Sequence, residues 1–341
     1  MKTIMKTLFV SIASLSVMFS VNAGELGVSG TAKATYHITH GQQSDNTIGI
    51  TNELNFTASG EMDNGYAWAY SAALDPDQSD GSALNDDTSI VITMNDLGTA
   101  KICVSTCGNS KEYAFDQSAY TSMSDTGLSP SIEYPISASS YASLQYHTPE
   151  LPFGTTGHVA YGQSKNDGNS GNKQMGSNGN NITTYSLVTK PVDGLTVSAS
   201  FYEIEDYDDG VTTEVQLEEG GAYGITYAAG NFTLGYGKSY KAPEASAISA
   251  GTTTIEYYEN TGVSIGFAVN DELSVSYTTE ESEVSYQTSS TASYDVEMNS
   301  VQLAYSLGGA TLSLARADYD NISYTNGLDA SDTIIAVNFA F

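Results

Sequence analysis

The sequence of 341 residues has no long apolar run beyond its first 23 residues. A helix that crosses a bilayer needs about 20 consecutive apolar residues, so this absence excludes a helical membrane protein. Apolar residues instead recur singly at every second position, which is the period of a strand whose two faces meet different surroundings. The sequence therefore predicts an all-β protein.

Basic residues are also scarce. Lys and Arg together number 11 against 40 Asp and Glu, which gives a formal net charge of −29. A field of this sign repels polyanions, so nucleic acid is excluded as a partner. The acidic excess has two interpretations, solubility in a salty medium or attraction of cations. Composition alone does not distinguish them, because it does not say where the charges lie.

Cysteine is limited to Cys103 and Cys107. A disulfide can form in an exported chain, but four residues of extended strand span about 13 Å, beyond the Cα separation of about 7 Å that a bridge allows. A bridge therefore requires a turn between the two, and both alternatives stay open. The pair alone supplies too few ligands for a structural zinc site.

The sequence carries no pattern that predicts catalysis. Its four histidines stand among many serines by composition alone, whereas such an enzyme would need a His base beside a Ser or a pair of acids. We expect no enzymatic activity and no cofactor. The acidic clusters at 75–87 and 203–219 are candidates for weak divalent-cation binding that bridges lipopolysaccharide phosphates.

Residues 1–23 have the pattern of a cleaved secretory signal. Lys2 and Lys6 charge the start, an apolar stretch follows from Leu8 to Val21, and Val21-Asn22-Ala23 has the form of a cleavage site. We expect an exported chain with a single domain, 24–341. Loss of the two lysines takes the formal net charge from −29 to −31.

Sixteen segments of this sequence show the alternation of apolar and polar residues that is typical of strands. The connections between them are alternately short and long without exception. The predicted strands are 26–38, 47–59, 66–74, 88–95, 99–106, 139–148, 155–164, 181–190, 195–205, 220–228, 231–240, 253–269, 273–284, 295–307, 310–320 and 332–341. An even strand count with short turns at one end and longer loops at the other is typical of bacterial outer-membrane barrels. The pattern predicts a 16-stranded antiparallel transmembrane β-barrel, which is wide enough for an aqueous channel.

The last predicted strand is apolar on one face to its end. Ile335, Val337, Phe339 and Phe341 share that face. In a closed membrane barrel such a face meets lipid and the strand pairs with the first one. We expect it to close the sheet against residues 26–38.

The chain is similar to the Gram-negative trimeric outer-membrane porins over its whole mature length. The resemblance rests on the signal, the first strand from Leu26 to Ala32, the sixteen-strand alternation, an oversized third long segment at 107–138 and the terminal Phe341. It implies a homotrimer in the outer membrane, in contact with lipid and lipopolysaccharide, whose third loop folds inward. It also implies that Phe339 and Phe341 form the signal read by the barrel assembly machinery.

The resemblance also predicts where the channel narrows. The third segment would place Lys111, Glu112, Asp116, Asp125 and Glu133 at a constriction, although the Pro-Glu-Phe-Gly-Gly signature of enterobacterial third loops is missing. The alternative is that segment 107–138 is an ordinary external loop whose charges are solvated.

Strand parity puts few bases on the opposite wall. Lys33, Glu53 and Lys101 face the lumen, with His37, His147 and His158 also inward. The small number of basic residues on the lumen side predicts a preference for cations. Arg316 shares the lipid-facing parity, and a bulge, a position at the rim and a subunit contact all remain open for it.

The leading interpretation is a passive diffusion channel for ions and small hydrophilic solutes. The alternative is a substrate-specific channel with an aromatic track, for which Tyr113, Tyr120 and Tyr134 are candidates. A structural surface protein with a plugged lumen is the third possibility.

Overall fold

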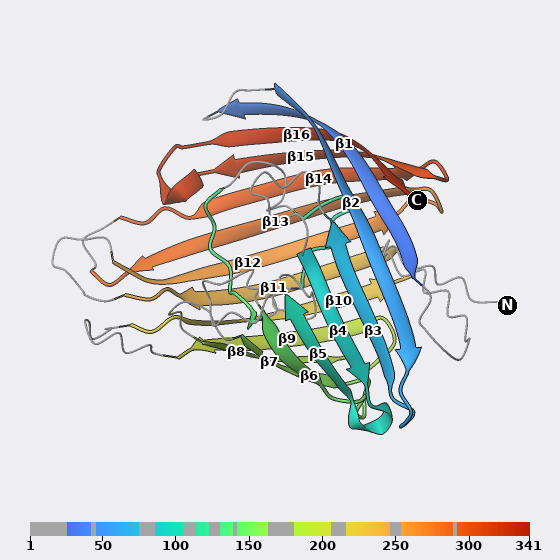
Figure 1. The fold of residues 1–341 in the computed structure, drawn as a ribbon. Coiled ribbons are helices and arrows are strands. Elements are labelled where there is room, and N and C mark those ends of the chain that lie inside the picture. The colour runs from blue at the N-terminus through green and yellow to red at the C-terminus, as the bar shows by residue number, and fades with distance from the viewer. Residues whose placement is uncertain are drawn as a thin grey trace.

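Sixteen antiparallel strands form one closed sheet in the computed structural model of the chain (Figure 1). The structure describes residues 26–41, 46–74, 86–104, 114–122, 130–138, 142–162, 181–205, 216–245, 254–288 and 292–341. The expected signal, 1–23, and the candidates Lys111, Glu112 and Asp125 lie outside the described residues. Among the described residues, no helix is long and apolar enough to cross a bilayer.

The strands follow one another around the barrel in chain order, and most of their bounds fall within a few residues of those predicted. They are β1 (Gly27–Gly41), β2 (Asn46–Glu61), β3 (Ala67–Leu74), β4 (Asp86–Thr93), β5 (Thr99–Val104), β6 (Ser143–His147), β7 (Thr156–Gly162), β8 (Ile182–Thr189), β9 (Leu195–Ile204), β10 (Glu219–Ala229), β11 (Phe232–Ala242), β12 (Ile255–Ala268), β13 (Leu273–Tyr286), β14 (Val296–Ser306), β15 (Ala310–Asp320) and β16 (Ala330–Ala340). Two short 3₁₀ helices, η1 (Asn95–Leu97) and η4 (Ile322–Tyr324), lie in connections.

The barrel is closed by pairing between its first and last strands. β1 pairs with β16 in an unbroken register from Thr31 opposite Ala340 to Gly41 opposite Ala330. Beyond it, the Phe341 N–H donates to the Gly30 carbonyl at 3.0 Å and the Gly30 N–H donates to the Phe341 carbonyl at 2.7 Å. Closure gives both strands a backbone partner on each side, which removes the sheet edges.

Tight turns join the strands at one end of the barrel, which we call the short-turn end. The turn between β2 and β3 places Gly65 at φ 78°, a left-handed conformation that the Asn64-Gly65 pair accommodates readily. The connection between β4 and β5 is instead a single turn of 3₁₀ helix, η1. The opposite end, which carries the longer connections, is the long-loop end.

Side chains alternate between an outer and an inner face along the strands. In β13, Ser276 and Thr278 are buried whereas Tyr277 between them is 45% exposed. The inner face is polar and crowded, and the outer face is apolar and open. Exposed outer side chains include Ile48, Ile50, Leu144, Val159, Leu187, Leu234, Val263, Ile265, Leu312, Leu314 and Ile335.

Arg316 lies on the outer face, as the parity of β15 indicated. β15 keeps an unshifted register with both neighbouring strands, so no bulge reverses the orientation. The Arg316 Nη2 pairs with Asp318 Oδ1 at 2.5 Å and Nη1 donates to Thr333 Oγ1 at 3.1 Å. The paired carboxylate reduces the cost of a cation on this face.

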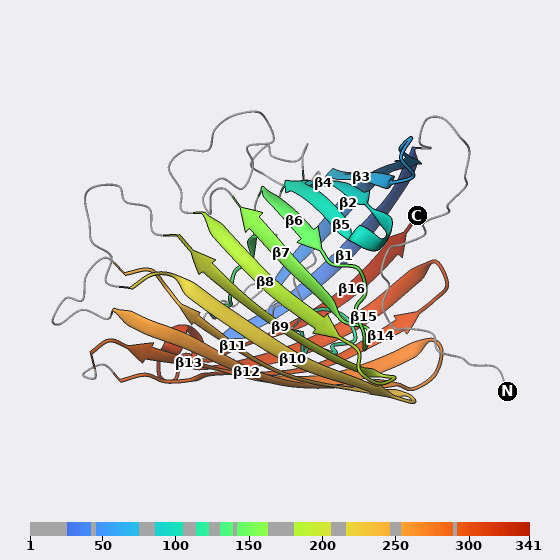
Figure 2. The ribbon, with the colours of Figure 1, turned by 90° about the horizontal axis from the view of Figure 1, so that it is seen from below.

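The wall of the barrel differs in height around its circumference (Figure 2). The strands from β3 to β8 contain five to eight residues each. β1, β2 and β9 to β16 contain ten to sixteen. A strand that crosses a bilayer takes about 9–11 residues. β6 and β8, which have described residues on both sides, are shorter than this, with five and eight residues.

Replacing the exposed Val263 by Arg tests whether the outer face meets lipid. We expect V263R to destabilise the barrel folded in lipid vesicles by about 2–4 kcal/mol, because an arginine there has to enter hydrocarbon. Urea unfolding in vesicles measures the change, with V263L as the control of similar shape. Equal stability of the two variants would contradict a lipid-facing outer wall.

Candidate functional site: the inner wall and the third long segment

The structure places Lys33, Glu53 and Lys101 on the inner face, opposite to the exposed apolar positions of their strands. The Lys33 Nζ lies 5.9 Å from the centre of the Tyr120 ring, which belongs to the third long segment. Glu53 accepts a hydrogen bond from Asn55. Lys101 is buried.

A histidine pair lies beside Lys101 near the short-turn end. His147 on β6 is directly opposite His158 on β7, and their rings stack with centroids 4.2 Å apart. The Nε2 of His147 lies 3.1 Å from the Gln145 side-chain oxygen, and Gln145 is opposite Lys101. This part of the wall therefore combines the cation of Lys101 with two stacked imidazole rings.

Cys103 lies on the same inner wall and is disulfide-bonded. The chain has one other cysteine, Cys107, which lies outside the described residues. The distance that disfavours a bridge assumes one extended strand through both cysteines, and β5 ends at Val104. The argument from extended-strand distances therefore does not apply.

Residues 114–122 of the third segment lie against the inner face of β10 to β14. Residues 114–117 fit against four glycines on the wall, Gly224, Gly235, Gly262 and Gly266, with backbone atoms at three of them and the Phe115 ring at Gly262. A Cβ atom at any of these positions would come within 3.0 Å of residues 114–117. We call these four residues the glycine bed. It lets two backbones approach each other closely because no wall side chain stands between them.

Side chains of the wall replace a strand partner for this stretch. The Gln117 N–H donates to Ser264 Oγ and the Ala119 N–H to Ser276 Oγ, both at 2.8 Å. The Gln302 side chain bonds the backbone further on, accepting from Tyr120 N and Thr121 N at 3.0 Å and donating to Thr121 O at 2.8 Å. A non-regular backbone is thus satisfied without a ladder.

Asp116 is turned toward the wall. Its Oδ1 accepts from the Ser118 N–H at 2.8 Å, the Ser118 hydroxyl at 2.5 Å and the Thr278 hydroxyl at 3.2 Å. The carboxylate therefore fixes the course of the segment in addition to contributing charge. The sequence suggested only an acid that projects into the aqueous path.

Residues 130–138 cross the same wall closer to the long-loop end. Ile132 packs against an apolar cluster on β14 to β16 and η4, and Ile136 packs against another on β7 to β9. Between them, the Tyr134 hydroxyl donates to Glu280 Oε2 at 3.0 Å, and beyond them the Ala138 N–H donates to Thr184 Oγ1 at 2.8 Å. This stretch is thus held along its whole length.

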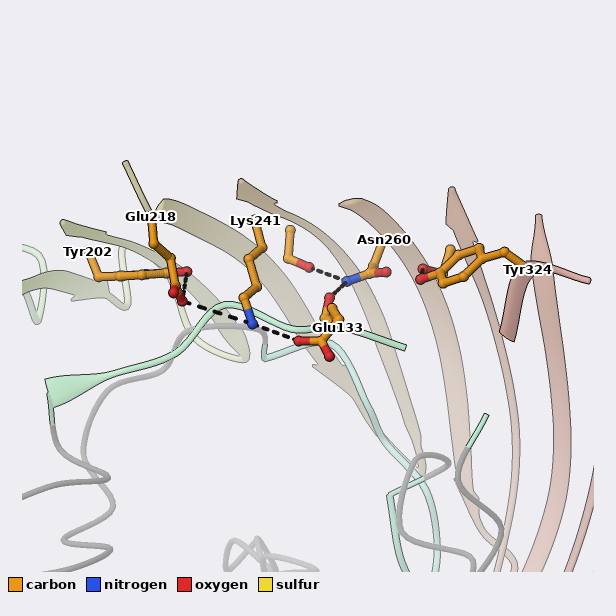
Figure 3. Close-up of polar contacts among 8 residues, drawn as sticks. Glu133, Tyr202, Glu218, Lys241, Asn260 and Tyr324 are labelled. Carbon is orange, nitrogen blue, oxygen red and sulfur yellow. Dashed lines mark hydrogen bonds and ion pairs between the residues drawn. The ribbon is translucent and has the colours of Figure 1, made fainter. Parts of the chain in front are cut away.

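Glu133 takes part in a charged cluster on the concave side of the sheet (Figure 3). Lys241 Nζ lies 2.6 Å from Glu133 Oε2 and 4.0 Å from Glu218 Oε1. The Tyr202 hydroxyl donates to Glu218 at 3.4 Å, and the Asn260 side chain donates to the Glu133 carbonyl at 3.0 Å. We call Glu133, Glu218 and Lys241 the carboxylate–lysine cluster.

Sequence reasoning missed Lys241 and Glu218. It ended the eleventh strand at residue 240 and placed 206–219 in an acidic loop, whereas β11 runs to Ala242. The two-residue period of the strand could have placed Lys241, because it shares the inner face with the buried Ser239.

Tyr324 in η4 adds a neutral polar group at the long-loop end. Its hydroxyl lies 2.8 Å from Ser282 Oγ and its ring centre 5.6 Å from that of Tyr258. Burial raises the pKa of Tyr324 above its ordinary value. The hydroxyl therefore stays protonated at physiological pH and adds no negative charge.

No protein-family model and no curated protein sequence matches the chain. Several solved structures do. A porin refined at 1.8 Å resolution has a TM-score of 0.67 at 16% identity, with 93% of this chain and 100% of that chain covered. OmpF of Salmonella typhi in complex with daunomycin has a TM-score of 0.66 at 14% identity, covering 93% and 98%. An anion-selective porin from Comamonas acidovorans has a TM-score of 0.64 at 12% identity, covering 93% and 100%.

This chain has the porin fold. At 12–16% identity the likeness concerns the fold alone. One protein with the porin fold is described as anion-selective, whereas the sequence here predicts a preference for cations. Selectivity must therefore be argued from the charges of this chain.

The described parts of the third segment lie along the inner wall of the porin fold, but the segment as a whole is not described. Residues 105–113, 123–129 and 139–141 lie outside the described residues, so its complete inward course stays a prediction. Of the candidate aromatic track, Tyr120 packs against Ala315, Ile334 and Ala336, and Tyr134 bonds Glu280. Tyr113 is outside the described residues.

A methyl group in the glycine bed tests how the segment is positioned. We expect G235A to lower single-channel conductance, because the Phe115 carbonyl would have to leave the wall and move toward the lumen. Planar-bilayer recording measures this. Gly309 has open space around its Cβ position, so G309A is the control, and equal conductance of the two variants would refute the positioning role.

Proposed function

We propose that the protein is an outer-membrane channel for passive diffusion of ions and small hydrophilic solutes, with a preference for cations. The observation that carries the proposal is a closed sixteen-strand barrel with an apolar outer face and a polar inner face. Two stretches of the third long segment lie on that inner face. A barrel of this strand number encloses an aqueous path, and the proposal includes no enzymatic activity.

The preference for cations follows from the charges on the inner wall. Glu53, Glu218, Glu280 and Asp332 contribute carboxylates there, and Asp116 and Glu133 contribute two more on the third segment. The fixed bases described above are Lys33, Lys101 and Lys241. A cleft lined by one sign of charge raises the local concentration of ions of the opposite sign. Glu112 and Asp125 would add to the excess.

Bilayer recording with a salt gradient tests both parts of the proposal. Purified protein should insert and conduct in KCl, and the reversal potential should have the sign of a membrane more permeable to K⁺ than to Cl⁻. Protein that inserts without carrying current would contradict a channel. An anion-selective reversal potential would contradict only the charge argument.

We further propose that the protein is exported by residues 1–23 and works as a homotrimer. The short strand β6 supports the trimer, because a strand below bilayer height gains from being covered by another subunit rather than by lipid. An outer-membrane protein of Vibrio cholerae with this fold is described in a trimer form. Weak divalent-cation binding by loops 75–87 and 203–219, and an assembly role for Phe339 and Phe341, stay predictions.

Site-specific photo-crosslinking tests the proposed homotrimer. A benzophenone side chain at Leu144, on the outer face of the short strand β6, should give dimeric and trimeric adducts. The same probe at Val263, on the long strand β12, should not. Adducts from Val263 alone would place the subunit contact on the other side of the barrel.

A further inference from the structure

We propose that Lys241 sets the ion selectivity of the channel at its long-loop end by neutralising Glu133 of the third segment together with the buried Glu218. The inference rests on the proposed channel function and assigns a selectivity-determining role to a residue of the wall. It concerns the carboxylate–lysine cluster of Figure 3.

One ammonium group serves two carboxylates in this cluster. The Lys241 side chain is only 11% exposed, and its Nζ lies 2.6 Å from Glu133 and 4.0 Å from Glu218. At such distances an ion pair in the less polar surroundings of a protein wall interacts more strongly than one in bulk water. The three groups together carry one negative charge, and without the ammonium they carry two.

The exposures of the two carboxylates decide which of them permeating ions meet. Glu133 is 47% exposed on the inner side of the wall, whereas Glu218 is 5% exposed. Its exposure lets the field of Glu133 reach the aqueous path directly. Lys241 therefore masks the acid that would otherwise attract cations most strongly at this level of the barrel.

The position of the segment does not depend on Lys241 alone. Asn260 still holds the Glu133 carbonyl, Tyr134 bonds Glu280, and Ala138 bonds Thr184. Ile132 and Ile136 pack into apolar clusters on either side. Removal of the ammonium should therefore change the charge at the cluster while the backbone of 130–138 stays on the wall.

β11 also supplies a matched control. Lys238 lies three residues earlier with the opposite parity, so it faces outward, and its Nζ pairs with Glu259 Oε1 at 2.6 Å. This pair has the same chemistry and the same N–O distance as Lys241 with Glu133. It differs in facing away from the lumen.

The experiment measures the K⁺/Cl⁻ permeability ratio from reversal potentials for the full-length wild type and four variants. We expect K241Q to raise the ratio by about twofold, since one more uncompensated charge faces the aqueous path. E133Q should lower the ratio, and E133Q/K241Q should return it close to the wild-type value because the net charge of the cluster is restored. K238Q should leave the ratio unchanged.

An unchanged ratio in a conducting K241Q channel would overturn the proposal, as would an equal rise in K238Q. Heat-modifiable electrophoretic mobility shows which variants are folded. If K241Q does not fold, E133Q decides: a ratio equal to that of the wild type refutes the role of the cluster. A wild type that inserts without conducting defeats the proposed function itself, which separates the two failures.

Discussion

The structure depends on one constraint, that every backbone N–H and C=O group of the wall has a partner. Pairing of β1 with β16 meets this constraint for the sheet as a whole, and the bonds between Gly30 and Phe341 extend it beyond the last strand. Once the sheet is closed, the two-residue period of each strand divides the side chains into an outer and an inner set. The lumen is a consequence of that division.

The third segment meets the same constraint by other means. Its described stretches have no strand partner, so hydroxyls and amides of the wall take that place, as Ser264, Ser276 and Gln302 do for residues 117–121. The serine- and threonine-rich inner face is therefore more than a solvated surface. Its short side chains donate and accept the hydrogen bonds that hold an irregular backbone, and the glycine bed provides the space for that backbone.

The strands could be predicted from the sequence because the signal is local. Alternation from Leu273 to Tyr286, or from Ala310 to Asp320, is enough to place β13 and β15. The course of the third segment carries no comparable period. Its contacts join residues more than a hundred positions apart, such as Tyr120 with Gln302, and nothing near Asp116 indicates that Thr278 will bond it. Lys241 was missed for a smaller reason, since the eleventh strand was ended just before it.

The glycine bed also has a consequence for how such a channel can vary. Gly224, Gly235, Gly262 and Gly266 leave room for residues 114–117 because they lack side chains. A methyl group at Gly224 or Gly235 would meet the backbone of Ala114 or Phe115 and has to displace the segment toward the lumen. The lack of side chains at these positions therefore helps to set the free cross-section of the channel. Substitutions in the glycine bed would thus change the width of the channel in small steps, at positions that permeating solutes do not contact.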